Sequence, residues 1–159
     1  MKRRIMENID GVEHVFYEND SIDFVTVAYK RFDYMKVLVR SIEKYVDYPH
    51  TIYIVNNGPK KGFDELSEIF KDNDRVKIVE GMEQDEDGKI VDTERFVFTG
   101  ETKHDKRVVN LDSYAQAVGM EIGIKAGTGK YVCNVEHDVV FLGKWVKDLL
   151  PLLIKNVFV

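Results

Sequence analysis

Four short apolar runs, rich in β-branched and aromatic residues, recur along the chain and predict β-strands. Each run is nearly continuous and does not alternate cleanly with polar residues, which is typical of strands that are covered on both faces. Strands are therefore expected at Phe24–Tyr29, Thr51–Asn56, Val76–Glu80 and Lys130–Glu136.

The segments between these runs carry apolar residues every three or four positions, which is the spacing of an amphipathic helix. Helices are expected from Phe32 to Tyr45 or Val46, from Phe63 to Phe70, and from Asp112 or Ser113 to Ala126. Strands and helices thus alternate, and this order predicts an α/β domain. We expect a mostly parallel, open sheet with helices on both faces and right-handed crossovers.

Two regions do not fit this alternation. Residues 1–22 form a polar N-terminal extension, and Glu13–Tyr17 within it is expected to add an edge strand to the sheet. Residues 81–109 form a charged insert, whose first half contains six acidic residues. A solvated surface loop is the favoured interpretation of that half, and a mobile lid or acceptor-side loop is the alternative. In the second half, Arg95–Gly100 is expected to form one arm of a hairpin.

Small residues recur every fourth position on the third predicted helix, at Ala115, Gly119, Gly123 and Gly127. Because a glycine inside a helix costs about 1 kcal/mol relative to alanine, this row needs a reason in the packing. Close approach of the helix to the sheet is the favoured reason, and approach to a ligand is the alternative. Near the other end of the chain, Pro151 is expected to interrupt a helical pattern.

Composition narrows the class of protein. The 159 residues are 44% hydrophobic and carry a net charge of −5, which fits a folded domain and offers no basic surface for nucleic acid. No stretch is long and apolar enough for a transmembrane segment, and acidic residues follow the basic start where a signal peptide would be apolar. The lone Cys133 excludes an internal disulfide, so a cytoplasmic location is expected. Whether the chain forms a homo-oligomer is left open.

Charged and amide residues follow the predicted strands at the edge of the sheet where ligands of open α/β domains bind. Glu136-His137-Asp138 is the sharpest of these features, because it directly follows an apolar strand. Carboxylate oxygens of this kind hold Mg²⁺ or Mn²⁺, whose other ligands are water and phosphate oxygens. His137 is either a third ligand, a substrate contact or a surface imidazole. The glycine-rich phosphate motifs, the nucleophile elbow of hydrolases and zinc-ligand spacings are missing from the sequence.

Four blocks of the chain, in the same order, resemble family 2 glycosyltransferases with the GT-A fold. Ser113–Phe141 resembles the stretch that precedes and includes that family's DxD motif, with Gly129–Tyr131 leading into the strand and Glu136–Asp138 as the acidic triplet. Val25–Arg31 resembles the family's first strand and the loop after it, and Ile54–Gly58 resembles the end of its second strand. The resemblance covers roughly residues 23 to 153.

The resemblance implies that residues 23–159 form a GT-A-like, Rossmann-related nucleotide-sugar-binding domain without the C-terminal acceptor half. It implies a nucleotide-diphosphate sugar donor, an acceptor hydroxyl that is not identified, and an inverting transfer that depends on Mn²⁺ or Mg²⁺. Asn56 stands where the family has an acid, and the sequence assigns no general base. The substrate-binding candidates are Tyr29, Lys30, Arg31, Asn56, Asn57, Glu136 and His137, and the metal-binding candidates are Glu136 and Asp138.

Two other functions remain open at this point. A non-catalytic nucleotide-sugar-binding or assembly module would keep the fold without the chemistry. A sugar-phosphate nucleotidyltransferase would share a related fold, but it should carry a loop rich in glycine and arginine after the first strand, and Tyr29–Phe32 is not such a loop.

Overall fold

The computed structural model describes residues 5–9, 12–16, 19–87 and 111–156. Its centre is a sheet of four parallel strands in the order β5-β4-β3-β6. The strands are β3 (Asn19–Ala28), β4 (His50–Asn56), β5 (Val76–Glu80) and β6 (Gly129–Asn134). All four predicted strands are therefore confirmed, although the first begins earlier than its apolar run suggests.

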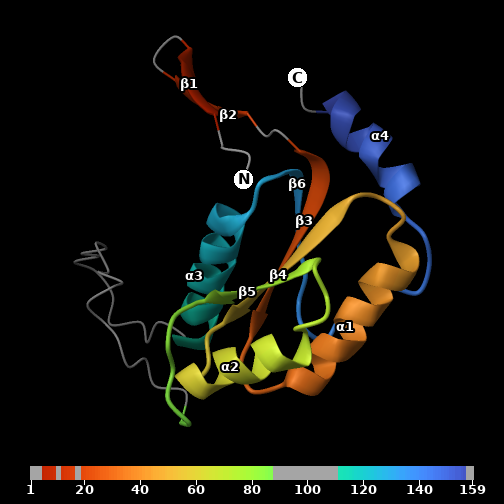
Figure 1. Cartoon of the computed structure of the whole chain (residues 1–159). Coiled ribbons are helices and arrows are strands. Elements are labelled where there is room, and N and C mark those ends of the chain that lie inside the picture. The colour runs from red at the N-terminus through yellow and green to blue at the C-terminus, as the bar shows by residue number, and fades with distance from the viewer. Residues whose placement is uncertain (1–4, 10–11, 17–18, 88–110, 157–159) are drawn as a thin grey trace.

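Helices cover both faces of this sheet, as Figure 1 shows. The helices are α1 (Phe32–Tyr45), α2 (Lys60–Ile69), α3 (Leu111–Ala126) and α4 (Val146–Asn156). The first three each lie between strands that follow one another in the chain: α1 joins β3 to β4, α2 joins β4 to β5, and α3 returns the chain from β5 at one edge of the sheet to β6 at the other. The predicted α/β architecture is confirmed.

The alternation of side chains along β3 divides the core between the two faces. Phe24 and its neighbours at even positions pack with Ile52 and Ile54 of β4 against buried residues of α1 and α2, such as Leu38 and Leu66. Val25 and Val55, which point to the other face, lie against α3. Burial of both faces explains why these strands read as continuous apolar runs.

The row of small residues on α3 allows that helix to approach the sheet closely. A Cβ atom added at Gly123 would lie 2.4 Å from a methyl group of Val25 and 2.9 Å from one of Val55. No side chain larger than hydrogen fits at that separation, so helix–sheet packing accounts for this glycine.

Two local expectations were wrong. The strand expected at Glu13–Tyr17 exists as β2 (Val12–Phe16), but it pairs antiparallel with β1 (Ile5–Ile9) in a separate two-stranded sheet. A hairpin partner next in sequence is the least costly one to reach, which explains this choice. Pro151 does not end the last helix, because α4 continues through it; a proline removes one helical hydrogen bond, and the rest of the helix tolerates the loss.

The charged insert is only partly described, and the arm expected at Arg95–Gly100 lies outside the described residues. Residues 81–87 differ from a solvated loop, since Met82 is fully buried and Gln84 is 6% exposed. Among the described helices, none is long and apolar enough to cross a membrane.

Candidate functional site

A pocket of about 160 Å³ lies beyond the carboxyl ends of the strands. The chain runs from β3 outward to β4 and β5 and then returns to the other side of β3 as β6. The order of strands therefore reverses between β3 and β6, which is the point where open α/β sheets bind ligands. The lining residues are Val27, Tyr29, Asn57, Gln84, Ala115, Gln116 and His137.

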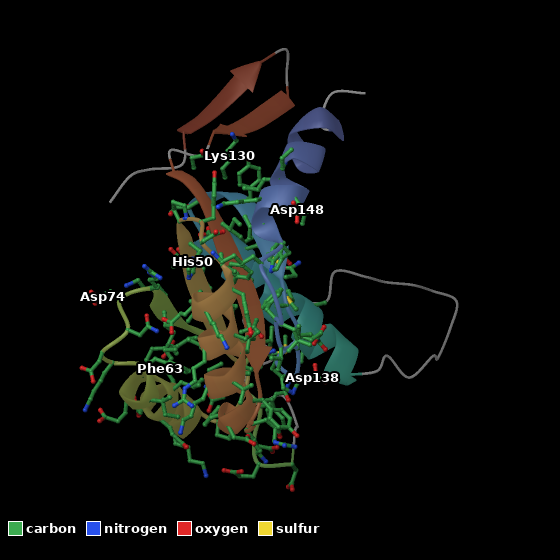
Figure 2. All side chains as sticks on the ribbon, turned by 90° about the vertical axis from the view of Figure 1, so that its right-hand side faces the viewer. His50, Phe63, Asp74, Lys130, Asp138 and Asp148 are labelled. Carbon is green, nitrogen blue, oxygen red and sulfur yellow. The ribbon has the colours of Figure 1, made fainter. Side chains whose placement is uncertain are left out.

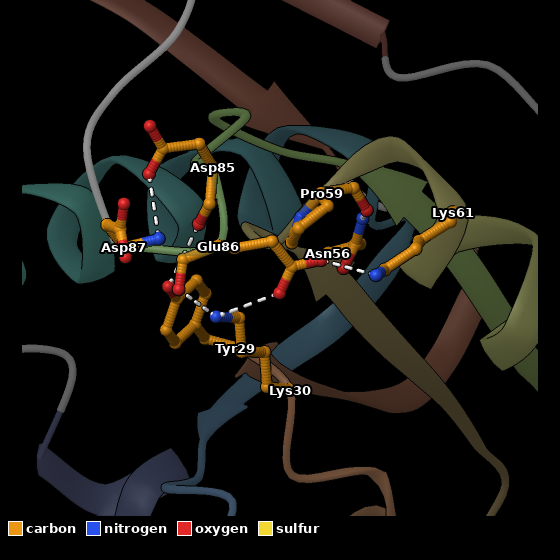
Figure 3. A network of polar contacts seen from close by, with 8 residues as sticks. All are labelled: Tyr29, Lys30, Asn56, Pro59, Lys61, Asp85, Glu86 and Asp87. Carbon is orange, nitrogen blue, oxygen red and sulfur yellow. Dashed lines mark hydrogen bonds and ion pairs between the residues drawn. The ribbon is translucent and has the colours of Figure 1, made fainter.

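Tyr29 and Lys30 leave the end of β3 and hold the segment that follows β5. The Tyr29 hydroxyl donates a hydrogen bond to the carbonyl of Asp85, at 3.0 Å. Lys30, whose φ of 60° is unusual for a residue other than glycine, forms an ion pair with Glu86 at 3.1 Å. Lys61, near the start of α2, contacts the same carboxylate. Figure 3 shows this network.

The electrostatics of the network follow from these contacts. Hydrogen bonds from Lys61 and then Lys30 lower the pKa of the Glu86 carboxyl, and the bond to Glu86 raises the pKa of Lys30. Both groups are exposed to solvent, so each pair contributes little to folding stability. The contacts therefore determine the position of residues 85–87 and add little to the folding stability of the chain.

The two neighbouring asparagines at the end of β4 have different surroundings. Asn57 is buried and lines the pocket, where its amide nitrogen donates to the carbonyl of Ala115 at 2.6 Å and its oxygen accepts from the backbone of Met82 at 3.0 Å. Asn56 is also buried, but its amide bonds with the backbone of Gly58 and Pro59 at the entry to α2. Asn57 thus connects the pocket's walls, and Asn56 holds a turn beside them.

Arg31 lies outside the set of lining residues. Its guanidinium is 3.9 Å from the centre of the Tyr34 ring on the first turn of α1, and it approaches the carboxylate of Asp33 at 3.6 Å. The Tyr34 ring also stacks on His137, with their centres 6.0 Å apart. His137 is half-buried by this contact and lines the pocket, so it is not a fully solvated imidazole.

The two acids of the triplet are exposed at the end of β6, next to the pocket. The Glu136 carboxylate accepts hydrogen bonds from the side chain of Gln116, which lines the pocket. Asp138 lies at the same end of the sheet, as Figure 2 shows. Within the described parts of the chain, no group of three or more His, Cys, Asp or Glu side chains could hold a metal ion. A cation at Glu136 and Asp138 would therefore need further oxygen ligands from water or phosphate.

Sequence reasoning missed two polar residues of the pocket, Gln84 and Gln116. Gln116 lies near the start of α3, the helix that precedes β6 in the chain. The start of that helix was predicted, so the order of the elements could have indicated that Gln116 lies at the same end of the sheet as the triplet. Gln84 lies within an acidic stretch without periodicity, and the sequence holds no signal that would separate it from its exposed neighbours.

Comparison with solved structures shows the fold. The chain is similar to residues 1–349 of S. aureus TarS, with a TM-score of 0.52 and 13% identity, over 86% of this chain and 33% of that one. The same part of TarS in complex with UDP matches with a TM-score of 0.52 and 14% identity, over 86% and 32%. A longer TarS structure matches with 0.51 and 14%, over 85% and 20%.

This chain thus spans about a third of the length of the TarS 1–349 structure. No family model and no curated protein matches it. At this level of identity the likeness concerns the fold, and it confirms the expected open α/β sheet of the GT-A type.

Proposed function

We propose that this chain is the donor-binding part of a glycosyltransferase, which binds a nucleoside diphosphate sugar in the pocket between β3 and β6. The observation that supports the proposal most is the position of the pocket. It lies at the reversal of strand order in a fold that the chain shares with TarS, which has been solved in complex with UDP. The activity of TarS itself is not carried over by the fold alone.

The lining residues suit the two halves of such a ligand. Tyr29 and Asn57 would contact the nucleoside, with the aliphatic walls of Val27 and Ala115 beside it. His137 would contact the substrate on the β6 side. Lys30, Arg31 and Asn56 remain predicted contacts, since their observed partners are other residues of the chain.

Glu136 and Asp138 fit a divalent cation such as Mn²⁺ or Mg²⁺. Both are exposed carboxylates at the end of one strand, so neither is committed to a buried partner. Gln116 would orient the Glu136 carboxylate toward the pocket's edge. When bound, the cation would neutralise the negative charge that develops on a leaving diphosphate.

The reaction would be a displacement at the anomeric carbon of the donor sugar. An acceptor oxygen forms the new bond to that carbon while the bond to the diphosphate oxygen breaks, and the acceptor proton passes to a general base. The pocket's contribution is to hold the nucleoside so that the diphosphate extends toward Asp138, which makes the reacting geometry reproducible.

Calorimetric titration of the whole chain with UDP, with and without Mn²⁺, tests this proposal. We expect Mn²⁺ to strengthen UDP binding and Asp138→Ala to abolish the Mn²⁺-dependent part. That loss should exceed the roughly 10- to 100-fold effects that changes around metal ligands cause. Asp148→Ala is the matched control, because Asp148 is an exposed acid on α4, well away from Asp138 (Figure 2).

Two outcomes would redirect the proposal. UDP binding that responds neither to Mn²⁺ nor to Asp138→Ala would remove the metal assignment. Binding of UDP-sugars with no release of UDP, and therefore with neither hydrolysis nor transfer, would favour the non-catalytic binding module.

A further inference from the structure

Gln84 is a buried polar residue at the pocket that the described structure does not use. It is 6% exposed and lines the pocket. Among the described residues, none forms a hydrogen bond with its carboxamide, and neither carboxamide atom is fully enclosed without a partner. A carboxamide that lines the pocket and has no hydrogen-bond partner among the described residues offers both a donor and an acceptor to a ligand there.

The backbone on either side of Gln84 is held in place. On one side, Met82 is fully buried and its amide donates to Asn57 at 3.0 Å. On the other side, the Asp85 carbonyl accepts from Tyr29, and Glu86 is bound by two lysines. Figure 3 shows this second anchor. Gln84 therefore stands between two fixed points and is preorganised for binding.

The order of the strands indicates which part of the ligand Gln84 meets. The segment 81–87 follows β5, at one edge of the sheet, and the Glu136–Asp138 triplet follows β6, at the other edge. If the diphosphate extends toward the triplet, the base lies on the side of Gln84. A neutral carboxamide offers one donor and one acceptor side by side, which matches the edge of a pyrimidine.

We propose that Gln84 binds the edge of the nucleotide's base by a pair of hydrogen bonds and thereby determines recognition of the base. This inference rests on the proposed function, because it assumes that a nucleotide occupies the pocket. For uracil, the Gln84 oxygen accepts from N3–H while its amide nitrogen donates to a ring carbonyl. N3-methyluracil, which lacks the N3–H, offers no donor to the Gln84 oxygen and is rejected.

Titration of the whole chain with uridine and N3-methyluridine, without metal or phosphate, tests this inference separately from the metal site. We expect the wild-type chain to bind uridine roughly 5- to 50-fold more tightly than N3-methyluridine. Gln84→Met, which keeps the side chain's size, should weaken uridine binding to the level of the methylated nucleoside. Glu83→Gln, at the exposed neighbouring position, should leave the ratio unchanged. Gln84→Met should also keep the wild-type melting temperature within a few degrees, because no described hydrogen bond of the fold is lost.

The outcomes separate the two proposals. Equal binding of both nucleosides by the wild type, or a ratio that survives in Gln84→Met, would overturn the role of Gln84 and leave Mn²⁺-dependent UDP binding unaffected. A second outcome is that the preference for uridine over N3-methyluridine is lost in Gln84→Met, while UDP binding responds neither to Mn²⁺ nor to Asp138→Ala. That outcome would support this inference and refute the metal site. If the wild type binds neither uridine nor UDP, both proposals fail.

Discussion

Because α3 lies close to the sheet, we expect Gly123→Ala to destabilise the chain, whereas helix propensity alone predicts that it stabilises it. In an exposed helix, Gly→Ala adds about 1 kcal/mol of stability. At Gly123 the new Cβ would lie 2.4 Å from a methyl group of Val25, and both Val25 and Val55 are fully buried in central strands. Overpacking of this kind costs about 1–3 kcal/mol. Because neither valine has a flexible end that could move aside, we expect a cost in the upper part of this range, about 2–3 kcal/mol. After the gain of about 1 kcal/mol in helix propensity, Gly123→Ala should destabilise the chain by about 1–2 kcal/mol net.

Thermal unfolding measured by circular dichroism checks this value. For a chain of this size, 1 kcal/mol corresponds to about 2–4 °C, so the melting temperature of Gly123→Ala should fall by about 2–8 °C. Ala117→Gly is the matched control at an exposed position of the same helix, and it should lose about the 1 kcal/mol of propensity. A Gly123→Ala variant at least as stable as the wild type would show that α3 does not lie this close to β3 and β4.

Two further predictions concern titratable groups away from the pocket. Hydrogen bonds from Lys147 and Lys144 lower the pKa of Asp47 below its ordinary value of 3.8. The wild-type chain should therefore be more stable than Asp47→Asn above pH 3.8, and this difference should disappear as the pH falls through the lower pKa of Asp47 in the native state. Melting temperatures of both chains, measured from about pH 2 to pH 7, check this expectation. Burial raises the pKa of the Cys133 thiol, so at pH 8 iodoacetamide should alkylate the native chain more slowly than the urea-unfolded chain; equal rates would contradict the buried environment.

The fold could be predicted from the sequence because its signals are repeated and local. Each strand of the sheet is an apolar run, and a helix lies between each pair of consecutive strands. The row of small residues also indicated that α3 lies close to the sheet, and the contacts at Gly123 confirm it. The partner of β2 was beyond such reasoning, since an isolated apolar run shows that a strand forms and does not show with which strand it pairs.

The site was harder to predict, because neighbouring residues can serve different purposes. Asn56 and Asn57 are adjacent and chemically identical, yet only Asn57 lines the pocket. Successive residues at a strand end point to opposite sides, so which one faces the pocket depends on the residue at which the strand stops. Gln84 depends on something still less local, namely the fold of segment 81–87 over the end of β3.

The glycine row and the pocket, which sequence reasoning treated as separate features, are physically one arrangement. A Cβ atom at Gly119 would lie 2.9 Å from the amide nitrogen of Asn57, and that same nitrogen donates to the carbonyl of Ala115 one turn earlier in α3. The close approach of α3 therefore brings Asn57 against the helix and places Ala115 and Gln116 at the pocket's wall. Small residues were expected to serve either the sheet or a ligand. On α3 they allow the helix to lie against the sheet, and the same close approach places Ala115 at the pocket's wall.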